Sequence, residues 1–241
     1  HRTPAPPRAS RGLTSSRVSI RVVLEVAPKR TFASALDWPG WSRSGRTEDE
    51  AIDALLRCAS RYAAVAKRAS VSFAPPAKPE GTEVVDRLRG GGVTEFGAPG
   101  KPSALEDEPV SPATLKRLLT LLRASWSTFD AAAEHAADAK LAKGPRGGGR
   151  DLDTIIDHVR QAEVAYLGKL GSRGPASANE SAEEPMALLR STFADALVSV
   201  VAGTPPADPS RTRKLWSPRY SVRRAAWHVL DHAWEIEDRT P

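Results

Sequence analysis

The chain has 241 residues, of which 40% are hydrophobic and 27% charged, the composition of a folded protein with a sizeable core. No apolar run approaches the roughly 20 residues of a membrane-spanning helix, which excludes an α-helical membrane protein. Cys58 is the only cysteine, so no intrachain disulfide can form. The opening segment also lacks the apolar stretch of a secretory signal, and together these features predict a soluble cytoplasmic protein.

The net charge of +6 lies entirely at the start of the chain. Residues 1–30 carry seven basic side chains and one glutamate, so the rest of the chain sums to zero. We expect residues 1–16 to form a disordered basic arm. The folded part then has no basic excess for nucleic acid, and only the arm could contact an acidic partner of that kind.

The first expected elements form a small module over residues 17–96. Strands with β-branched residues are followed by a Pro39-Gly40 turn. Thr47 and Glu50 have the spacing of a capping box, in which each side chain satisfies a free backbone N–H at a helix start. The expected elements are strands at 17–26 and 31–36, a helix at 48–68, and strands at 71–75 and 82–88.

The stretch DWPGWSRSGRTEDEAIDAL (residues 37–55) resembles the HicB antitoxin-like fold. The signature of that fold is a strand, a proline–glycine turn and a G-x-T-x-E-E-A sequence that opens a helix. The resemblance covers about residues 18–75. It implies a sheet-and-helix module that mediates interactions rather than catalysis.

The second half of the chain has the apolar periodicity of helices. Four amphipathic helices with one long crossover predict a four-helix bundle over residues 111–241, after a linker at 97–110. The whole chain is therefore expected to be an α+β protein, with a small β-β-α-β-β domain followed by an all-α four-helix bundle. The expected helices run from Ser111 through Ala133, from Asp151 or Asp153 to Leu170, from the capping box Ser181-x-x-Glu184 to Gly203, and from 221 to 238.

Three histidines in these helices are candidate metal ligands. WHVLDHAW places His228 and His232 four residues apart, and therefore on one helix face. His158 lies beside the apolar stripe of the second helix, and bundles build metal sites from side chains on facing helices. Three neutral imidazoles with an open position are typical of a catalytic zinc site. The alternative is that these rings only fill a helix interface.

Glu235 continues the stripe of the last helix and is the candidate catalytic residue. Its carboxylate could orient a metal-bound imidazole or move a proton, because such imidazoles usually need a partner for their second nitrogen. The alternative is a solvated, salt-bridged face that includes Arg239.

One histidine in DHVRQAEVAYLGKL and the H-x-x-x-H pair in WHVLDHAWEIEDR resemble the DinB-like superfamily of four-helix bundles. The resemblance covers about residues 111–239, and His158, His228 and His232 fill the family's histidine triad. It implies a divalent ion, often zinc or nickel, with open sites that face a cleft. It also implies activities such as thiol-dependent S-transfer and mycothiol-dependent isomerisation.

These features favour a divalent-metal-dependent enzyme that acts on a small-molecule substrate. It would be a transferase that uses a low-molecular-weight thiol such as mycothiol or bacillithiol, or an isomerase or hydrolase. The HicB-like module would cover the bundle or form a homodimer. One alternative is a non-catalytic metal-binding regulator whose HicB-like module contacts a partner protein or nucleic acid. The other is a helical bundle that holds no metal.

Overall fold

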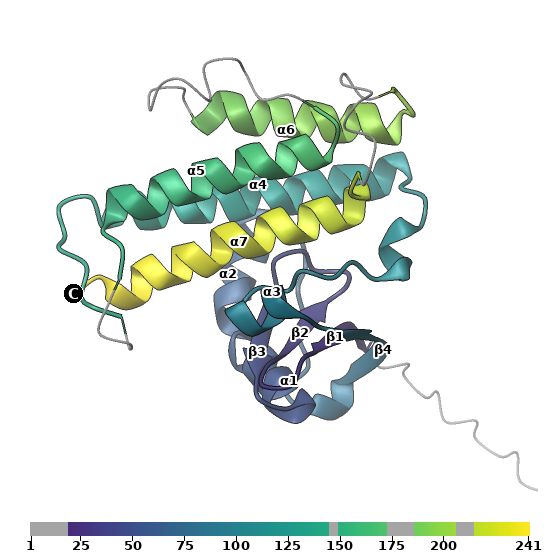
Figure 1. Cartoon of the computed structure of the whole chain (residues 1–241), viewed down its shortest axis with the longest axis horizontal. Helices are drawn as coiled ribbons and strands as arrows, with labels where there is room; N and C mark the ends of the chain where they lie inside the picture. The colour runs from purple at the N-terminus through teal and green to yellow at the C-terminus, as the bar shows by residue number, and fades with distance from the viewer. Residues whose placement is uncertain (1–18, 145–148, 173–185, 206–214) are drawn as a thin grey trace, which may run out of the picture.

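The computed structural model describes residues 19–144, 149–172, 186–205 and 215–241. These residues form a mixed α+β structure, in which a small sheet with its own helices lies against a group of long helices (Figure 1). The expected basic arm at 1–16 lies outside the described residues. None of the helices in the described ranges is long and apolar enough to cross a membrane.

The sheet consists of β1 (Ile20–Val26), β2 (Thr31–Ala35), β3 (Ser42–Gly45) and β4 (Thr82–Arg89). The strands lie in the order β3-β2-β1-β4. β1 pairs antiparallel with β2, in a register that places Val22 opposite Ala35, and pairs in parallel with β4. The expected strands at 17–26, 31–36 and 82–88 are therefore confirmed, with shorter or shifted ends.

The expected strand at 71–75 is wrong. This segment has no regular secondary structure and is not part of the sheet. Its alternating apolar residues pack on the core instead, and the Phe73 ring lies 4.7 Å from Trp38 and 5.0 Å from Trp41 between centroids. The third strand is instead the polar segment Ser42–Gly45. Its backbone forms hydrogen bonds with the free edge of β2, and these bonds do not depend on the side chains.

The expected helix at 48–68 is divided into α1 (Glu48–Arg57) and α2 (Ala59–Arg68). Its start is confirmed, since Thr47 Oγ1 accepts the Glu50 N–H at 3.1 Å. The division falls at Cys58, three residues after Leu55, whose backbone carbonyl accepts a hydrogen bond from a side chain. The Trp41 indole N–H donates to the Leu55 carbonyl at 2.9 Å. Insertion of a side-chain donor into the helix ladder is a known cause of such interruptions.

The long helices are α4 (Pro112–His135), α5 (Leu152–Lys169), α6 (Met186–Val201) and α7 (Pro218–Arg239). Ser111 and Asp151 cap α4 and α5 as expected, each accepting a backbone N–H from three residues ahead. α7 begins earlier than the expected residue 221, because Ser217 caps it and proline occupies its first position. The expected capping box at 181–184 lies outside the described residues.

Helix α7 is the central element of the molecule. It contacts α4, α5 and α6, and residues such as Val222, Val229 and Ile236 are fully buried in their shared apolar core. On its other side, Leu230 and Trp234 join the core formed by the sheet, α1 and α2. α7 therefore lies between the long helices and the sheet (Figure 1).

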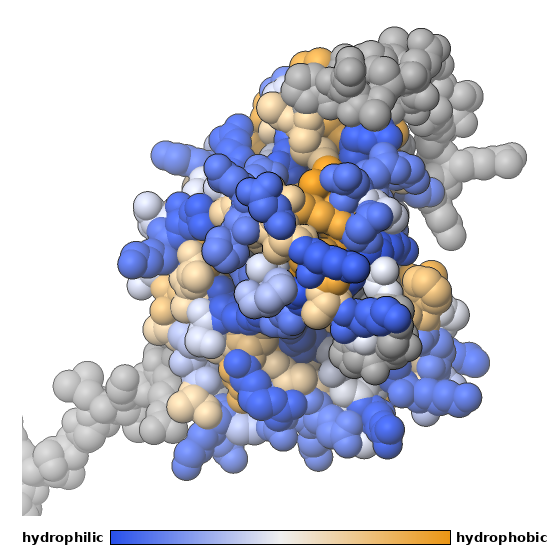
Figure 2. All heavy atoms as spheres, turned by 90° about the vertical axis from the view of Figure 1, so that its left-hand side faces the viewer, coloured by the Kyte–Doolittle hydropathy of each residue, from blue (hydrophilic) through white to orange (hydrophobic). Residues whose placement is uncertain are grey.

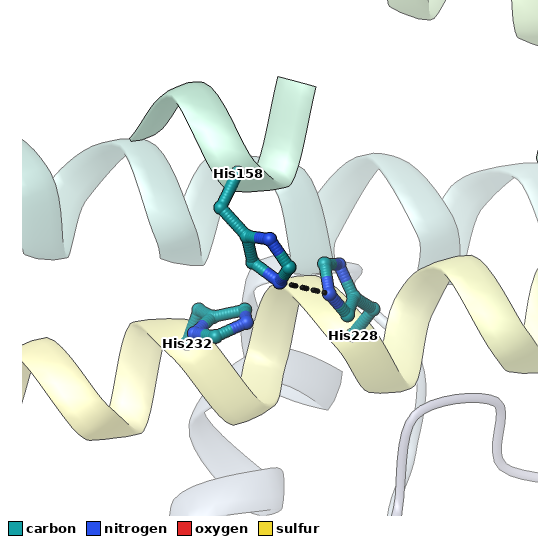
Figure 3. A group of neighbouring side chains, drawn as sticks. All are labelled: His158, His228 and His232. Atoms are coloured by element: carbon teal, nitrogen blue, oxygen red, sulfur yellow. Dashed lines mark hydrogen bonds between the residues drawn. The ribbon is translucent and has the colours of Figure 1, made fainter. Parts of the chain in front are cut away.

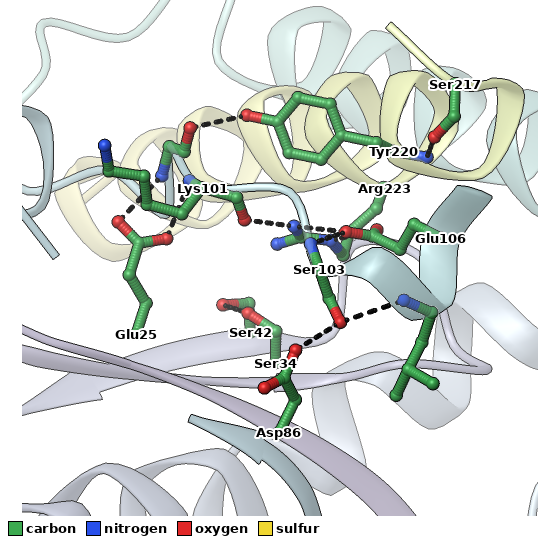
Figure 4. Close-up of polar contacts among 12 residues, drawn as sticks. Glu25, Ser34, Ser42, Asp86, Lys101, Ser103, Glu106, Ser217, Tyr220 and Arg223 are labelled. Atoms are coloured by element: carbon green, nitrogen blue, oxygen red, sulfur yellow. Dashed lines mark hydrogen bonds and ion pairs between the residues drawn. The ribbon is translucent and has the colours of Figure 1, made fainter. Parts of the chain in front are cut away.

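Residues 97–110, expected to form a linker, include a segment that forms hydrogen bonds with the sheet on one side and with α7 on the other. Glu25 of β1 accepts the Lys101 N–H at 2.9 Å, and Ser103 donates to Asp86 of β4 (Figure 4). The short 3-10 helix η2 (Ala104–Asp107) then places Glu106 against Arg223 of α7, with contacts of 2.6 and 2.9 Å. This segment thus connects the sheet to the start of α7.

The surface is largely polar on the face shown in Figure 2, where hydrophilic side chains cover most of the area and apolar ones show in the gaps between them. The short helix α3 (Gly92–Phe96) exposes a large apolar side chain, since Phe96 is 88% exposed. This helix lies beside a cavity described below.

A charge cluster joins α4, α5 and α6, with Glu163 and Arg190 buried and Asp130 exposed. Arg190 donates to Glu163 at 3.3 Å and to both carboxylate oxygens of Asp130 at 2.7 and 2.8 Å. Glu163 is almost fully buried, and burial raises the pKa of its carboxyl to about 7 against the opposing effect of the Arg190 charge. The proton on Glu163 therefore affects how stability depends on pH.

Glu163→Gln is expected to remove part of that pH dependence. The unfolded chain loses the Glu163 proton near pH 4.5 and the folded protein near pH 7. The protonated Glu163 carboxyl therefore contributes its full share of the free energy of unfolding below about pH 4.5. This share, on the order of 3 kcal/mol, is lost as the pH rises to about 7. Glutamine stays neutral, so urea unfolding of the variant should lack this loss, whereas the exposed control Glu134→Gln should keep it. Identical pH profiles for Glu163→Gln and the wild type would contradict the prediction.

Candidate metal centre

The three predicted histidines meet between two helices. His158 projects from α5 toward α7, where His228 and His232 lie one turn apart (Figure 3). The Nε2 atoms of His158 and His228 are 3.2 Å apart, and one ligand atom from each of the three rings lies within 4.8 Å of the others. The structure therefore brings together the residues that sequence spacing placed on facing helices.

The local sequence explains why these side chains point inward. His228 and His232 are 7% and 8% exposed, since α7 is buried on most of its circumference. On α5, Ile155 and Val159 are fully buried and flank His158, so the same stripe that fills the core turns the imidazole toward α7. His158 itself is half-buried.

The donor set fits a divalent transition metal. Two metal–nitrogen bonds of about 2.0–2.1 Å at a tetrahedral angle place their nitrogens about 3.3–3.4 Å apart. The separation of 3.2 Å between His158 and His228 is close to this value. The wider separations in the group, up to 4.8 Å, require side-chain rotation to close. Three imidazoles suit zinc, nickel, copper and iron alike, so the donors do not choose among these metals.

The protonation of the group also suits a metal. Burial holds the pKa of His228 well below its ordinary value, with further lowering from the charges of His232 and Arg224. Burial likewise lowers the pKa of His158. Only a neutral imidazole offers a lone pair to a metal ion, so both rings are in the form that binds.

Glu235 is placed to orient one ligand. Its Oε2 lies 2.8 Å from His232 Nδ1, and its Oε1 accepts a hydrogen bond from Arg239 at 2.7 Å. These contacts, with that to His232 first, lower the pKa of Glu235. A carboxylate at Nδ1 fixes the proton there and leaves the Nε2 lone pair of His232 free for a ligand role. Glu235 and Arg239 are thus ion-paired, and the pair is joined to the histidine group.

A cavity of about 430 Å³ lies beside the histidines. Its walls come from both halves of the molecule: α3 and the residues after it on one side, α5 and α7 on the other. The contributing residues other than the histidines are Gly92, Val93, Phe96, Gly97, Ala98, Arg150, Ala162, Tyr166, Arg224, Trp227 and Asp231. Sequence reasoning missed the wall from α3, because no local pattern indicates that residues near 95 fold against α7.

Among the described residues, the remaining thiol and imidazole groups lie away from this cluster. Cys58 is buried in the core beneath the sheet, and burial raises the pKa of its thiol, so it stays protonated. His135 is exposed at the last residue of α4. His1 is outside the described residues. The three clustered histidines are therefore the ligand set that the geometry offers.

Comparisons of the chain with protein-family models, with curated proteins and with solved structures find no match. We therefore infer function from the geometry and chemistry of the histidine group and its cavity.

Proposed function

We propose that the protein is a divalent-metal-dependent enzyme of the DinB-like type, in which α4, α5, α6 and α7 form a four-helix bundle. His158, His228 and His232 would hold the ion, with zinc or nickel as the best candidates. The observation that carries the proposal is the convergence of three imidazoles at the wall of a cavity large enough for a small molecule.

When bound, a divalent ion would supply Lewis acidity, which stabilises negative charge on a water or thiol that it coordinates. The chain's own residues prepare the site for this chemistry. Glu235 keeps the His232 proton on Nδ1, and Arg239 holds Glu235 in place. Tyr166 and Trp227 line the cavity with aromatic surface, against which the carbon skeleton of a small molecule would pack.

The reaction we propose is thiol-dependent transfer or isomerisation, with hydrolysis as the simpler possibility on the same site. Because the Cys58 thiol is buried and protonated, the chain does not supply a nucleophilic thiol of its own. A low-molecular-weight thiol such as mycothiol or bacillithiol would serve as cosubstrate. The N-terminal half, which we propose to be HicB-like, would act here as one wall of the cavity.

Metal titration tests the proposal. Metal-stripped protein is expected to bind one equivalent of Zn²⁺, and His228→Ala is expected to abolish this binding because one of three ligands is lost. Glu235→Gln should keep the site but weaken it by about 10- to 100-fold, since the partner of His232 Nδ1 becomes neutral. Competition with a chromophoric chelator gives the affinities.

His135→Ala is the matched control, because it removes an exposed histidine outside the group. It should bind Zn²⁺ like the wild type. Absence of Zn²⁺ binding by the wild-type protein would reject the metal site. A zinc-loaded protein that shows no calorimetric response to a low-molecular-weight thiol would reject thiol dependence while leaving the site intact.

A further inference from the structure

The cavity beside the histidines contains an arginine without an anionic partner. Arg224 lies one turn before His228 on α7 and lines the cavity. Its guanidinium lies 4.6 Å from the ring centroid of Trp227 and 5.3 Å from that of Tyr166. Its Nη1 is shielded from solvent and has no hydrogen-bond partner among the described residues. Ring faces attract the cation but do not satisfy its N–H donors.

The buried arginines differ from Arg224, which is only half-buried. Arg190, Arg223 and Arg239 each form an ion pair with a carboxylate, at 2.7, 2.6 and 2.7 Å. Arg224 has no such pair within the part of the chain that the structure describes. A guanidinium that is partly shielded from water and has no hydrogen-bond acceptor loses hydration free energy without compensation. A ligand carboxylate would supply the missing acceptor and the opposite charge.

The fixed charges around the cavity also favour an anion. Arg150 and Arg224 line it and place two positive charges at its wall. The acidic residue on the wall is Asp231, whose carboxylate is 3.3 Å from Arg43 and thus already has a cationic partner. With two arginines and one already paired carboxylate among the described lining residues, the cavity presents a positive potential to a small molecule.

A second donor strengthens the argument. Trp227 is 4% exposed and lines the same cavity, and within the described ranges its indole Nε1 also has no hydrogen-bond partner. Tyr166, Trp227 and Phe96 give the wall an aromatic character. The cavity is therefore lined by two residues that carry unpaired donors and by flat aromatic surface.

We propose that the substrate is a small carboxylate, whose carboxyl group binds Arg224 and whose carbon skeleton packs against the aromatic wall. A planar carboxylate matches the two parallel N–H donors of a guanidinium. The placement of the reacting end near His158, His228 and His232 rests on the proposed function. The carboxylate subsite itself rests on Arg224 and the cavity.

Calorimetric titration with phenylacetate and its neutral analogue phenylacetamide tests this subsite. The two probes have nearly the same shape and differ in charge. The wild-type protein is expected to prefer phenylacetate by about 10-fold or more, as for a hydrogen bond to a charged group. Arg224→Gln should lose this preference with little change for phenylacetamide. Arg224→Lys should retain part of it, because it keeps the charge without the planar donors.

Arg57→Gln is the control, since it removes the same charge from an exposed position on α1. It should keep the wild-type preference. Circular dichroism and thermal unfolding establish whether each variant is folded. If Arg224→Gln does not fold, Arg224→Lys still tests whether the preference depends on this residue. Equal binding of the two probes by the wild type would overturn the proposal, as would an unchanged preference in Arg224→Gln or tighter binding of inorganic phosphate.

Each titration is carried out on zinc-loaded and on metal-stripped protein, which separates the two proposals. A carboxylate preference that depends on Arg224 in stripped protein supports the subsite even if no Zn²⁺ binds to the histidines. Zn²⁺ binding without a carboxylate preference supports the metal site and overturns the subsite.

Discussion

Glu106→Ala is expected to destabilise the protein by about 3–5 kcal/mol, because it leaves a buried guanidinium without its counter-ion. Glu106 is 2% exposed and Arg223 is 4% exposed, so water cannot replace the lost carboxylate. The partner that remains for Arg223 is the Lys101 carbonyl, at 2.9 Å. Urea unfolding followed by circular dichroism measures the loss.

Asp107→Ala is the matched control, since Asp107 is the exposed neighbour of Glu106. It should change stability by no more than about 0.5 kcal/mol. The double variant Glu106→Leu with Arg223→Met removes both charges and should recover most of the loss, because apolar residues of similar volume can replace a buried ion pair. A Glu106→Ala protein as stable as the Asp107→Ala control would show that the pair does not hold residues 101–106 against α7.

Trp41→Ala is expected to cost about 3–5 kcal/mol through the cavity that it leaves. Trp41 is 1% exposed and stacks on Tyr62 with ring centroids 5.7 Å apart. Its indole N–H donates to the Leu55 carbonyl, which would lose this donor as well. Chemical unfolding of the variant gives the change in free energy.

Trp41→Phe separates these two contributions. It keeps most of the ring packing and removes the indole hydrogen bond, so its loss should be about 1–2 kcal/mol. Phe96→Ala, at an aromatic residue that is 88% exposed, should leave stability almost unchanged. Equal losses for Trp41→Ala and Phe96→Ala would mean that Trp41 does not fill the core beneath the sheet.

The starts of α4 and α5 were predictable because their signals are local, whereas the same kind of signal at Ser217 was missed and α7 was placed three residues late. Ser111 and Asp151 each cap the helix that follows within three residues, so the hydrogen bond that identifies them lies inside the motif. β3 could not be predicted for the opposite reason. Ser42–Gly45 is a strand because β2 pairs with it, and nothing in its own four residues indicates that partner.

The same distinction applies to the candidate site. His228 and His232 share a helix face by spacing alone, and the apolar stripe of α5 directs His158 toward them. Their approach to within 4.8 Å agrees with that reasoning, whereas metal binding stays a prediction. The α3 wall and the unpaired state of Arg224 depend on contacts between distant segments. Periodicity in one segment carries no information about such contacts.

The position of α7 between two cores has a consequence for the rate of folding. Arg43 and Asp231, which are paired across the sheet and α7, are separated by 188 residues, and Arg61 and Asp238 by 177. Pairings between residues so far apart in the chain form late in folding, because closing the loop between them lowers the chain entropy before the contacts provide stabilisation. We therefore expect docking of α7 to limit refolding, with apolar surface on the sheet side open to aggregation until that step is complete.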